Sequence, residues 1–105
     1  MIMRIWHGWT TLQNAGAYEG LLRTEIFTGI GARAIPGYRG IELLRRDVPD
    51  GVEFVTIMRF DSLDAVRSFA GEDHEAAVVP PSARRLLARF DARSAHYEVV
   101  ESRAP

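Results

Sequence analysis

One segment, residues 52–60, restricts the possible folds of this chain more than any other. Its sequence, VEFVTIMRF, is rich in β-branched and aromatic residues and predicts a β-strand. Side chains of a strand alternate between its two faces, so Phe54, Met58 and Phe60 share one face while Val55 and Ile57 share the other. Because both faces of this strand are apolar, the sheet that contains it needs cover on both sides.

Three further strands and three helices are expected around this segment. Residues 3–12, 38–46 and 94–101 have the composition of strands. After Asn14, which we expect to cap a helix, apolar residues recur at helical spacing as far as the glycines at 29 and 31. That helical stripe consists of Tyr18, Leu21, Leu22, Ile26 and Ile30.

The second half of the chain has its own start and stop signals. Asp61 or Ser62 is expected to cap a second helix that runs to about residue 70 and ends at Gly71. The pair Pro80–Pro81 blocks continuation, so residues 82–90 are expected to form a separate short helix.

The resulting order, β-α-β-β-α-α-β, predicts an α+β, ferredoxin-like fold with the helices on one face of an antiparallel sheet. The 105 residues contain no linker or repeat, so we expect a single domain over residues 1–105. Helices cover only one face, and an apolar second face marks an association site. We therefore expect a homodimer formed through the exposed sheet face.

Composition excludes several classes of function. Thirteen arginines and no lysines stand against 14 acidic residues, a formal net charge of −1, so neither nucleic acid nor an anionic membrane is an expected partner. The absence of cysteine excludes disulfides, thiolate nucleophiles and cysteine metal sites, and the absence of lysine excludes Schiff-base chemistry. No stretch resembles a secretion signal or a membrane span, so a cytoplasmic location is expected.

Four short motifs carry a resemblance to a known family. They are residues 35–40 (IPGYRG), 53–56 (EFVT), 60–65 (FDSLDA) and 96–99 (HYEV). With these motifs the chain resembles, over nearly its whole length, the antibiotic biosynthesis monooxygenase (ABM) type of dimeric α+β barrel. That family includes cofactor-free oxygenases that convert anthrone-like or hydroquinone-like aromatics to quinones, and enzymes that degrade haem.

The resemblance to the haem-degrading branch does not extend to its functional positions. That branch uses an Asn on the first strand, a Trp late in the second helix and an iron-ligating His ten residues later. By spacing, these positions fall on His7, Phe69 and Val79 in this chain. Valine cannot bind iron, so the resemblance implies a protein that works without a cofactor.

His7 and Arg23 are the candidate catalytic residues. The family alignment places His7, with Ile5 and Trp9, on the strand face that looks toward the helices. A neutral imidazole there could take a proton from a phenol, although a buried histidine held by one hydrogen bond is the structural alternative. Arg23 could stabilise the negative charge that this proton transfer creates.

Trp9, Tyr18 and Phe69 are the candidate substrate-binding residues. A flat aromatic wall suits a flat ligand, and a phenol can donate a hydrogen bond to a substrate oxygen. Each of the three could equally be an ordinary core residue, because aromatic side chains in strands and on helical stripes usually pack in the core.

Other polar residues are expected to be structural. Arg59 lies in an apolar strand and should pair with Glu53 or Glu98. His74 lies in the acidic stretch 72–75, which we interpret as a solvated loop or helix start and not as a metal site. His96 and Glu98 share one side of the last strand and could pair across the surface or across the dimer interface.

The function expected from the resemblance is a cofactor-independent monooxygenase that acts with O2. Its substrate would be a small electron-rich aromatic of the anthrone or hydroquinone type, and its product a quinone. The alternatives are a catalytically silent ligand-binding or stress-related dimer of the same fold, and a lactone isomerase.

Overall fold

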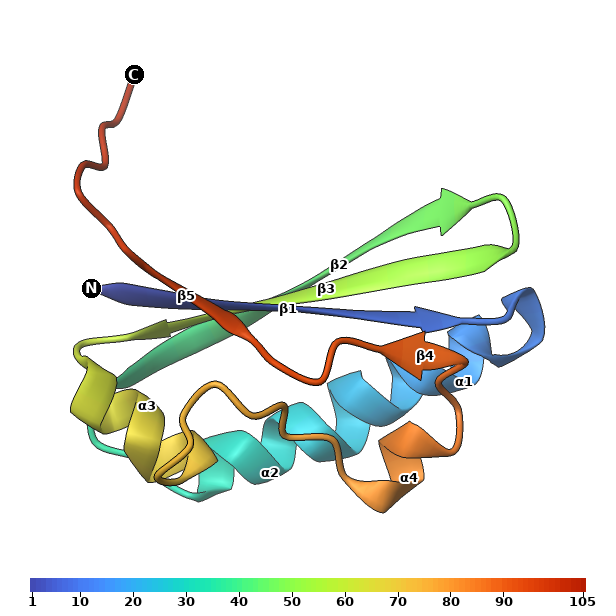
Figure 1. Ribbon diagram of the computed structural model, residues 1–105, viewed down its shortest axis with the longest axis horizontal. Helices are drawn as coiled ribbons and strands as arrows, with labels where there is room; N and C mark the ends of the chain where they lie inside the picture. The colour runs from blue at the N-terminus through green and yellow to red at the C-terminus, as the bar shows by residue number, and fades with distance from the viewer.

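The computed structural model describes residues 1–105 and contains one five-stranded antiparallel sheet (Figure 1). Its main strands are paired in the order β2-β3-β1-β4, and β5 also pairs with β1. The strands are β1 (Ile2–Thr10), β2 (Tyr38–Val48), β3 (Gly51–Phe60), β4 (Arg89–Phe90) and β5 (Ala95–Glu98). The strand predicted over residues 52–60 is β3, which lies between β2 and β1.

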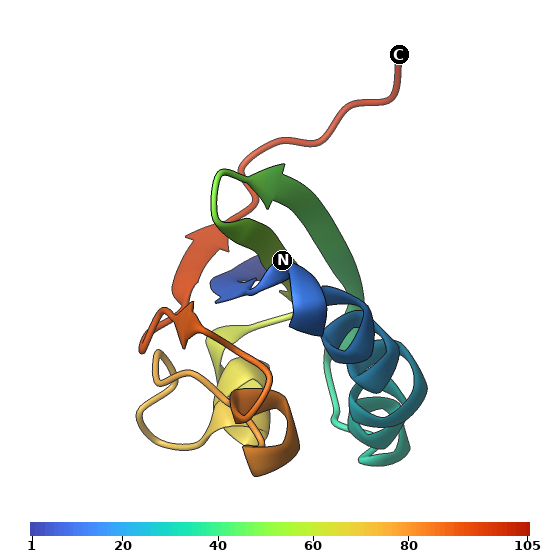
Figure 2. The same cartoon turned by 90° about the vertical axis from the view of Figure 1, so that its right-hand side faces the viewer.

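All helical segments lie on one face of this sheet, as Figures 1 and 2 show. They are α1 (Leu12–Leu21), the π-helical segment η1 (Leu22–Ile26), α2 (Phe27–Ala32), α3 (Leu63–Ala70) and α4 (Pro81–Arg84). This arrangement confirms the predicted α+β, ferredoxin-like class. No helix has the length and the apolar character that crossing a membrane requires.

The helix ends follow capping chemistry, with one correction. The hydroxyl of Ser62 accepts a hydrogen bond from the backbone N–H of Ala65, and Gly71, at a φ of 96°, ends α3 as predicted. The first helix is capped by Thr11, whose hydroxyl accepts from the Asn14 N–H at 3.1 Å. The prediction of Asn14 as the cap was therefore wrong, because Asn14 is the residue that the cap satisfies.

The chain between 81 and 99 differs from the prediction. Instead of one helix over 82–90, α4 ends at Arg84 and the chain returns to the sheet as β4. Ala88 N–H donates to the carbonyl of Trp9 at 2.8 Å and Asp91 N–H to that of His7 at 3.0 Å. These bonds to β1 satisfy the backbone groups that a longer helix would have paired internally.

Two apolar clusters form the core between sheet and helices. One gathers around Phe54, Tyr18 and Leu22, and the other around Phe60, Val66 and Phe69. Phe54 and Phe60 are fully buried and contribute to different clusters from the same face of β3. The core is thus divided along β3, where Thr56 separates Phe54 of the first cluster from Met58 and Phe60 of the second.

The register of β1 against β3 decides which side chains of β1 face the helices. Gly8 lies opposite Phe54 and Arg4 opposite Met58. Directly opposed residues share a sheet face, so the even-numbered residues of β1, Trp6 among them, point toward the helices. His7 and Trp9 therefore lie on the open face, and the expected orientation of this strand was wrong.

Candidate functional site

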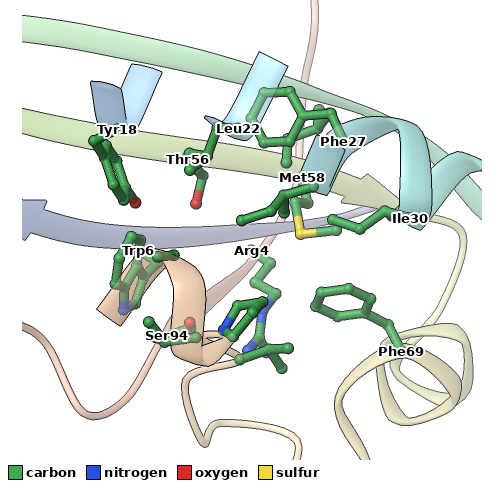
Figure 3. Close-up of a pocket in the computed structure, with 16 residues that line it drawn as sticks. Arg4, Trp6, Tyr18, Leu22, Phe27, Ile30, Thr56, Met58, Phe69 and Ser94 are labelled. Atoms are coloured by element: carbon green, nitrogen blue, oxygen red, sulfur yellow. The ribbon is translucent and has the colours of Figure 1, made fainter. Parts of the chain in front are cut away.

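A pocket lies between the middle of the sheet and the helices (Figure 3). Its inner cavity has a volume of about 60 Å³, and 12 of its 16 lining residues are hydrophobic. The sheet supplies Arg4, Trp6, Ile41, Thr56 and Met58, whereas Tyr18, Leu22, Ile26, Phe27, Ile30 and Phe69 come from the helices. The remaining wall is made by Val78, Val79, Pro80, Ala83 and Ser94.

An outer groove of about 270 Å³ adjoins this inner cavity. The two share the wall residues Ile26, Ile30, Phe69, Val78 and Pro80. An apolar cavity of about 150 Å³ is sufficient for benzene. The inner cavity alone is therefore smaller than one aromatic ring, and a ring-sized ligand would also occupy the groove or displace the wall.

The wall on the side of the first helix contains a departure from α-helical geometry. Residues 22–26 form a π-helical turn, which is rare and often found at functional sites. Leu22 and Ile26, the two ends of this turn, both line the inner cavity, as does Phe27 directly after it. The irregular turn thus belongs to the pocket wall.

Arg4 brings a buried positive charge to one side of the pocket. The residue is only 3% exposed, and its guanidinium donates to the carbonyls of His74 and Ala76 and to Nε2 of His96, at 3.0 Å. All three partners are uncharged groups, and Arg4 takes part in none of the ion pairs of the chain. Burial lowers the pKa of Arg4 to about 10, so it keeps its charge at neutral pH.

The hydrogen bond from Arg4 defines the state of His96. A guanidinium can only donate, so Nε2 of His96 must accept and the ring proton must sit on Nδ1. Burial and the charge of Arg4 lower the pKa of His96 to about 4. His96 is therefore neutral at physiological pH and leaves the charge of Arg4 uncompensated.

Three hydroxyl groups complete the polar part of the pocket. Figure 3 shows the hydroxyls of Tyr18 and Thr56 pointing into the cavity, across from Ser94 and the Arg4 guanidinium. Burial raises the pKa of Tyr18, which keeps its phenol protonated and able to donate. The Ser94 hydroxyl is buried and has no hydrogen-bond partner. Buried hydroxyls are normally satisfied, so Ser94 is an unusual feature of this wall.

Two of the five candidate site residues lie in the pocket. Tyr18, 2% exposed, and Phe69, 8% exposed, both line the inner cavity. The guanidinium of Arg4 lies 5.5 Å from the ring centroid of Phe69, within range of a cation–π interaction. The structure thus joins these two predicted residues with a charge that the sequence analysis did not consider.

The other three candidates lie outside the pocket. Arg23 is largely exposed and pairs with Glu19 at 3.3 Å. On the open face of the sheet, Nδ1 of His7 lies 2.8 Å from a Glu53 carboxylate oxygen, and the ring of His7 stacks on that of Trp9. The roles predicted for His7, Arg23 and Trp9 thus find no support in the geometry of this pocket.

The partners of Glu53 and Arg59 differ from those expected. The second carboxylate oxygen of Glu53 accepts from Arg46 at 2.6 Å, and these hydrogen bonds from His7 and Arg46 lower the pKa of Glu53. Arg59 pairs with Glu42 on β2, not with Glu53 or Glu98. Every charge named here on the open face has an opposite partner.

The histidine near the acidic stretch also has a structural role. His74 contributes its carbonyl to Arg4, and its ring lies 5.1 Å from that of His96. Within the chain His96 bonds to Arg4, and no hydrogen bond joins it to Glu98. No group of three or more metal-binding side chains comes together in the structure.

Sequence reasoning missed Arg4, Trp6, Thr56 and Ser94. One signal was present in the sequence, because Phe54, Met58 and Phe60 mark the covered face of β3. Antiparallel pairing of β1 with β3 then places the residues of β1 that lie opposite them on the same covered face. An arginine within the apolar run 2–6 was the second signal. Buried arginines are rare unless they are paired or functional.

Comparison with known proteins gives similarity of structure only. No family model and no curated protein sequence matches the chain. A solved structure from Bacillus cereus, assigned as an antibiotic biosynthesis monooxygenase, superposes with a TM-score of 0.67 at 19% identity, covering 100% of this chain and 96% of that one. The fold is that of ABM-type proteins.

Two further structural neighbours were solved with ligands. ActVA-Orf6, a monooxygenase of Streptomyces coelicolor in complex with nanaomycin D, has a TM-score of 0.61 at 14% identity, covering 99% of this chain and 91% of that one. A variant of MhuD with two manganese protoporphyrins bound per active site has a TM-score of 0.59 at 19% identity, with 100% of both chains covered.

The residues of this pocket do not fit haem. No histidine lines the cavity, and Val79, which occupies the position of the iron ligand by spacing, is one of the wall residues. The imidazole nearest to the charged end, His96, directs Nε2 at Arg4. The pocket therefore offers no histidine ligand to a haem iron.

Proposed function

We propose that the protein is a cofactor-independent monooxygenase that converts a small electron-rich aromatic compound to a quinone. The observation that supports this proposal is the pocket between sheet and helices, apolar on most of its surface and polar at Arg4, Ser94, Thr56 and Tyr18. Ligand sites combine an apolar lining with few polar groups in this way. The fold shared with ActVA-Orf6 supports the same class of reaction.

The size of the pocket favours a substrate with one or two rings. A ring between Trp6 and Phe69 would extend from the inner cavity of about 60 Å³ into the groove of about 270 Å³. Apolar walls exclude water, and this exclusion protects a reactive anion from protonation. A large anthrone would require a wider opening between α2 and α3.

The chemistry can proceed without a metal. The substrate loses a proton to bulk water and its anion gives one electron to O2. The two radicals combine at a ring carbon, and the resulting peroxide anion takes up a proton from water to form a hydroperoxide. Loss of water leaves a carbonyl. Overall the substrate loses two hydrogens and gains one oxygen atom, and the second oxygen atom of O2 leaves as water.

No carboxylate or imidazole lines the pocket, so the proton is not removed by a base in contact with the substrate. Instead, the uncompensated charge of Arg4 lowers the free energy of the substrate anion. Tyr18 and Thr56 donate hydrogen bonds from the opposite wall. The prediction of His7 as the base requires a different site, on the open face.

A mass-spectrometric assay tests this function. Single-ring and two-ring phenols and hydroquinones are incubated with the protein under 18O2, and each quinone is examined for one labelled oxygen atom. Conversion that continues without oxygen contradicts the proposal, as does a quinone that contains no label. Arg4→Met should abolish turnover and His7→Ala should leave it unchanged, whereas the reverse pattern would restore His7 as the base.

The same pocket without turnover would suit the second candidate function, a silent ligand-binding protein. The absence of a base among the lining residues favours this candidate. It predicts saturable binding of aromatic compounds with no product under oxygen. A lactone isomerase would instead form product equally well with and without oxygen.

We further propose that the protein is a homodimer formed through the open sheet face. That face carries Ile5, Val55, Ile57 and the exposed Leu44. Four of its charges pair internally, Glu53 with Arg46 and Arg59 with Glu42, and Arg89 stacks on Trp9. An apolar surface with neutralised charges is suited to a second copy. Sedimentation should give twice 11.8 kDa, and Ile57→Asp should give the monomer mass.

A further inference from the structure

The inner end of the pocket combines two features that are rare in a protein core. Arg4 is 3% exposed and has no carboxylate partner, and Ser94 is 4% exposed and its hydroxyl has no partner at all. Both residues line the same cavity. An unpaired buried charge and an unsatisfied buried hydroxyl each destabilise the folded state.

Building on the function proposed above, we propose that Arg4 and Ser94 together bind the anionic oxygen of an aryl oxyanion, a phenolate. A phenolate oxygen accepts several hydrogen bonds and carries the charge that Arg4 lacks. The guanidinium has five N–H donors, and its three bonds to protein groups leave others free. The Ser94 hydroxyl can supply one more donor.

The surroundings of this end of the pocket favour an anion over a neutral ligand. His96, the imidazole that contacts Arg4, accepts through Nε2 and is neutral, so it adds no second charge. No acidic residue lines the inner cavity. Glu25 lines only the outer groove, where Arg33 provides a positive charge as well. A negative group entering the cavity therefore meets one positive charge and no carboxylate.

Two aromatic residues of the pocket could hold the ring of the ligand so that its oxygen points at Arg4. Trp6 is fixed by a hydrogen bond from its indole N–H to the carbonyl of Asp91, at 2.8 Å. Figure 3 shows Trp6 and Phe69 on either side of Arg4. A ring between them would direct its oxygen at the guanidinium and leave its far end toward the outer groove.

The test compares two ligands of equal size on the complete protein. In mildly alkaline buffer 4-nitrophenol is an anion, whereas 4-nitroaniline is neutral and has nearly the same shape. Titration calorimetry should give an affinity at least about tenfold higher for the phenolate than for the aniline. Arg4→Met should abolish this preference and Arg4→Lys should retain part of it.

A matched pair of variants keeps the test informative if Arg4→Met does not fold. Ser94→Ala and Thr10→Val each delete a buried hydroxyl without a partner, but Thr10 does not line the pocket. Ser94→Ala should weaken phenolate binding severalfold and leave binding of the aniline unchanged. Thr10→Val should change neither.

The outcomes separate this inference from the function on which it rests. Equal binding of both ligands overturns the oxyanion site while leaving the pocket as a site for aromatic compounds. The same result follows if Thr10→Val weakens phenolate binding as much as Ser94→Ala does. Failure of both ligands to bind overturns the oxyanion site and the proposed function together.

Discussion

The two faces of the sheet contain similar residue types but differ in whether their charged side chains form ion pairs. On the open face, Glu53 lies between His7 and Arg46, Arg59 pairs with Glu42, and Arg89 stacks on the ring of Trp9. On the helix-covered face, the deeply buried Arg4 contacts only uncharged groups. Paired charges compensate each other within the folded chain, whereas an unpaired charge that lines a cavity is a candidate site for a ligand of opposite charge.

The largest effect should come from changing neighbouring residues that point to different faces. Phe54→Ala removes a fully buried ring from the covered face and should lower the free energy of unfolding by about 3–5 kcal/mol. Val55→Ala removes two methyl groups from the open face, where the side chain is only half-buried in one chain. Its cost in an isolated chain should be below about 1 kcal/mol.

Urea unfolding at several protein concentrations measures both effects. If the open face is covered by a second copy, the cost of Val55→Ala increases as the protein concentration rises. If both variants cost the same at every concentration, the distinction between a covered and an open face is wrong.

A smaller effect is expected from the pH dependence of His96. Its pKa is about 4 in the folded state and 6.5 when unperturbed, so between these values the unfolded chain binds more protons. Stability is then fully present above pH 6.5 and is lost as the pH falls toward 4. Because the ring is only partly buried, solvent screening reduces the expected loss to about 1–2 kcal/mol.

Thermal unfolding across this pH range, in the wild type and in His96→Gln, tests this assignment. Glutamine can still accept the hydrogen bond from Arg4 but does not titrate. The variant should show a flatter dependence on pH, and His74→Gln serves as the neighbouring control. An unchanged slope in His96→Gln would assign the acid sensitivity to other groups.

The smallest effect concerns two helical glycines, Gly16 in α1 and Gly29 in α2. A Cβ at Gly16 or at Gly29 would meet no atom within 4 Å, so each change to alanine should stabilise its helix by about 0.5–1 kcal/mol. Only Gly29 borders the outer groove. Both variants should therefore unfold at a higher temperature, while Gly29→Ala alone should reduce binding of two-ring ligands. Equal binding by both variants would exclude this part of the groove from the site.

The fold was predictable where local signals and tertiary packing agree. Residues 52–60 alternate between two apolar faces, and Ser62 and Gly71 mark the ends of α3, as the structure confirms. The prediction of a helix over 82–90 was wrong because the backbone of this segment forms hydrogen bonds with β1 instead. The local sequence does not reveal this pairing. A short apolar segment of this kind satisfies either a helix or an edge strand.

The site was less predictable because it depends on the register between strands that are distant in sequence. A shift of one residue in that register exchanges Trp6 and His7 between the two faces. Tyr18 was found because the apolar stripe of a helix indicates the side that is buried, and Phe69 because the family resemblance places a pocket residue at that position. Ser94 carried no local signal, since its importance follows from a missing partner that only the folded chain can reveal.

The π-helical turn at residues 22–26 has a consequence for how this pocket can change over evolution. Such a turn holds one residue more than an α-helical turn of the same rise, as a single-residue insertion would produce. Deleting one residue there would restore an ordinary α-helical turn and leave the later side chains of α2, including Phe27 and Ile30, in nearly the same orientation. The loss of one codon could thus reshape the part of the pocket wall formed by Leu22 and Ile26, while α2 and the sheet, with Arg4 and Trp6, stay in place.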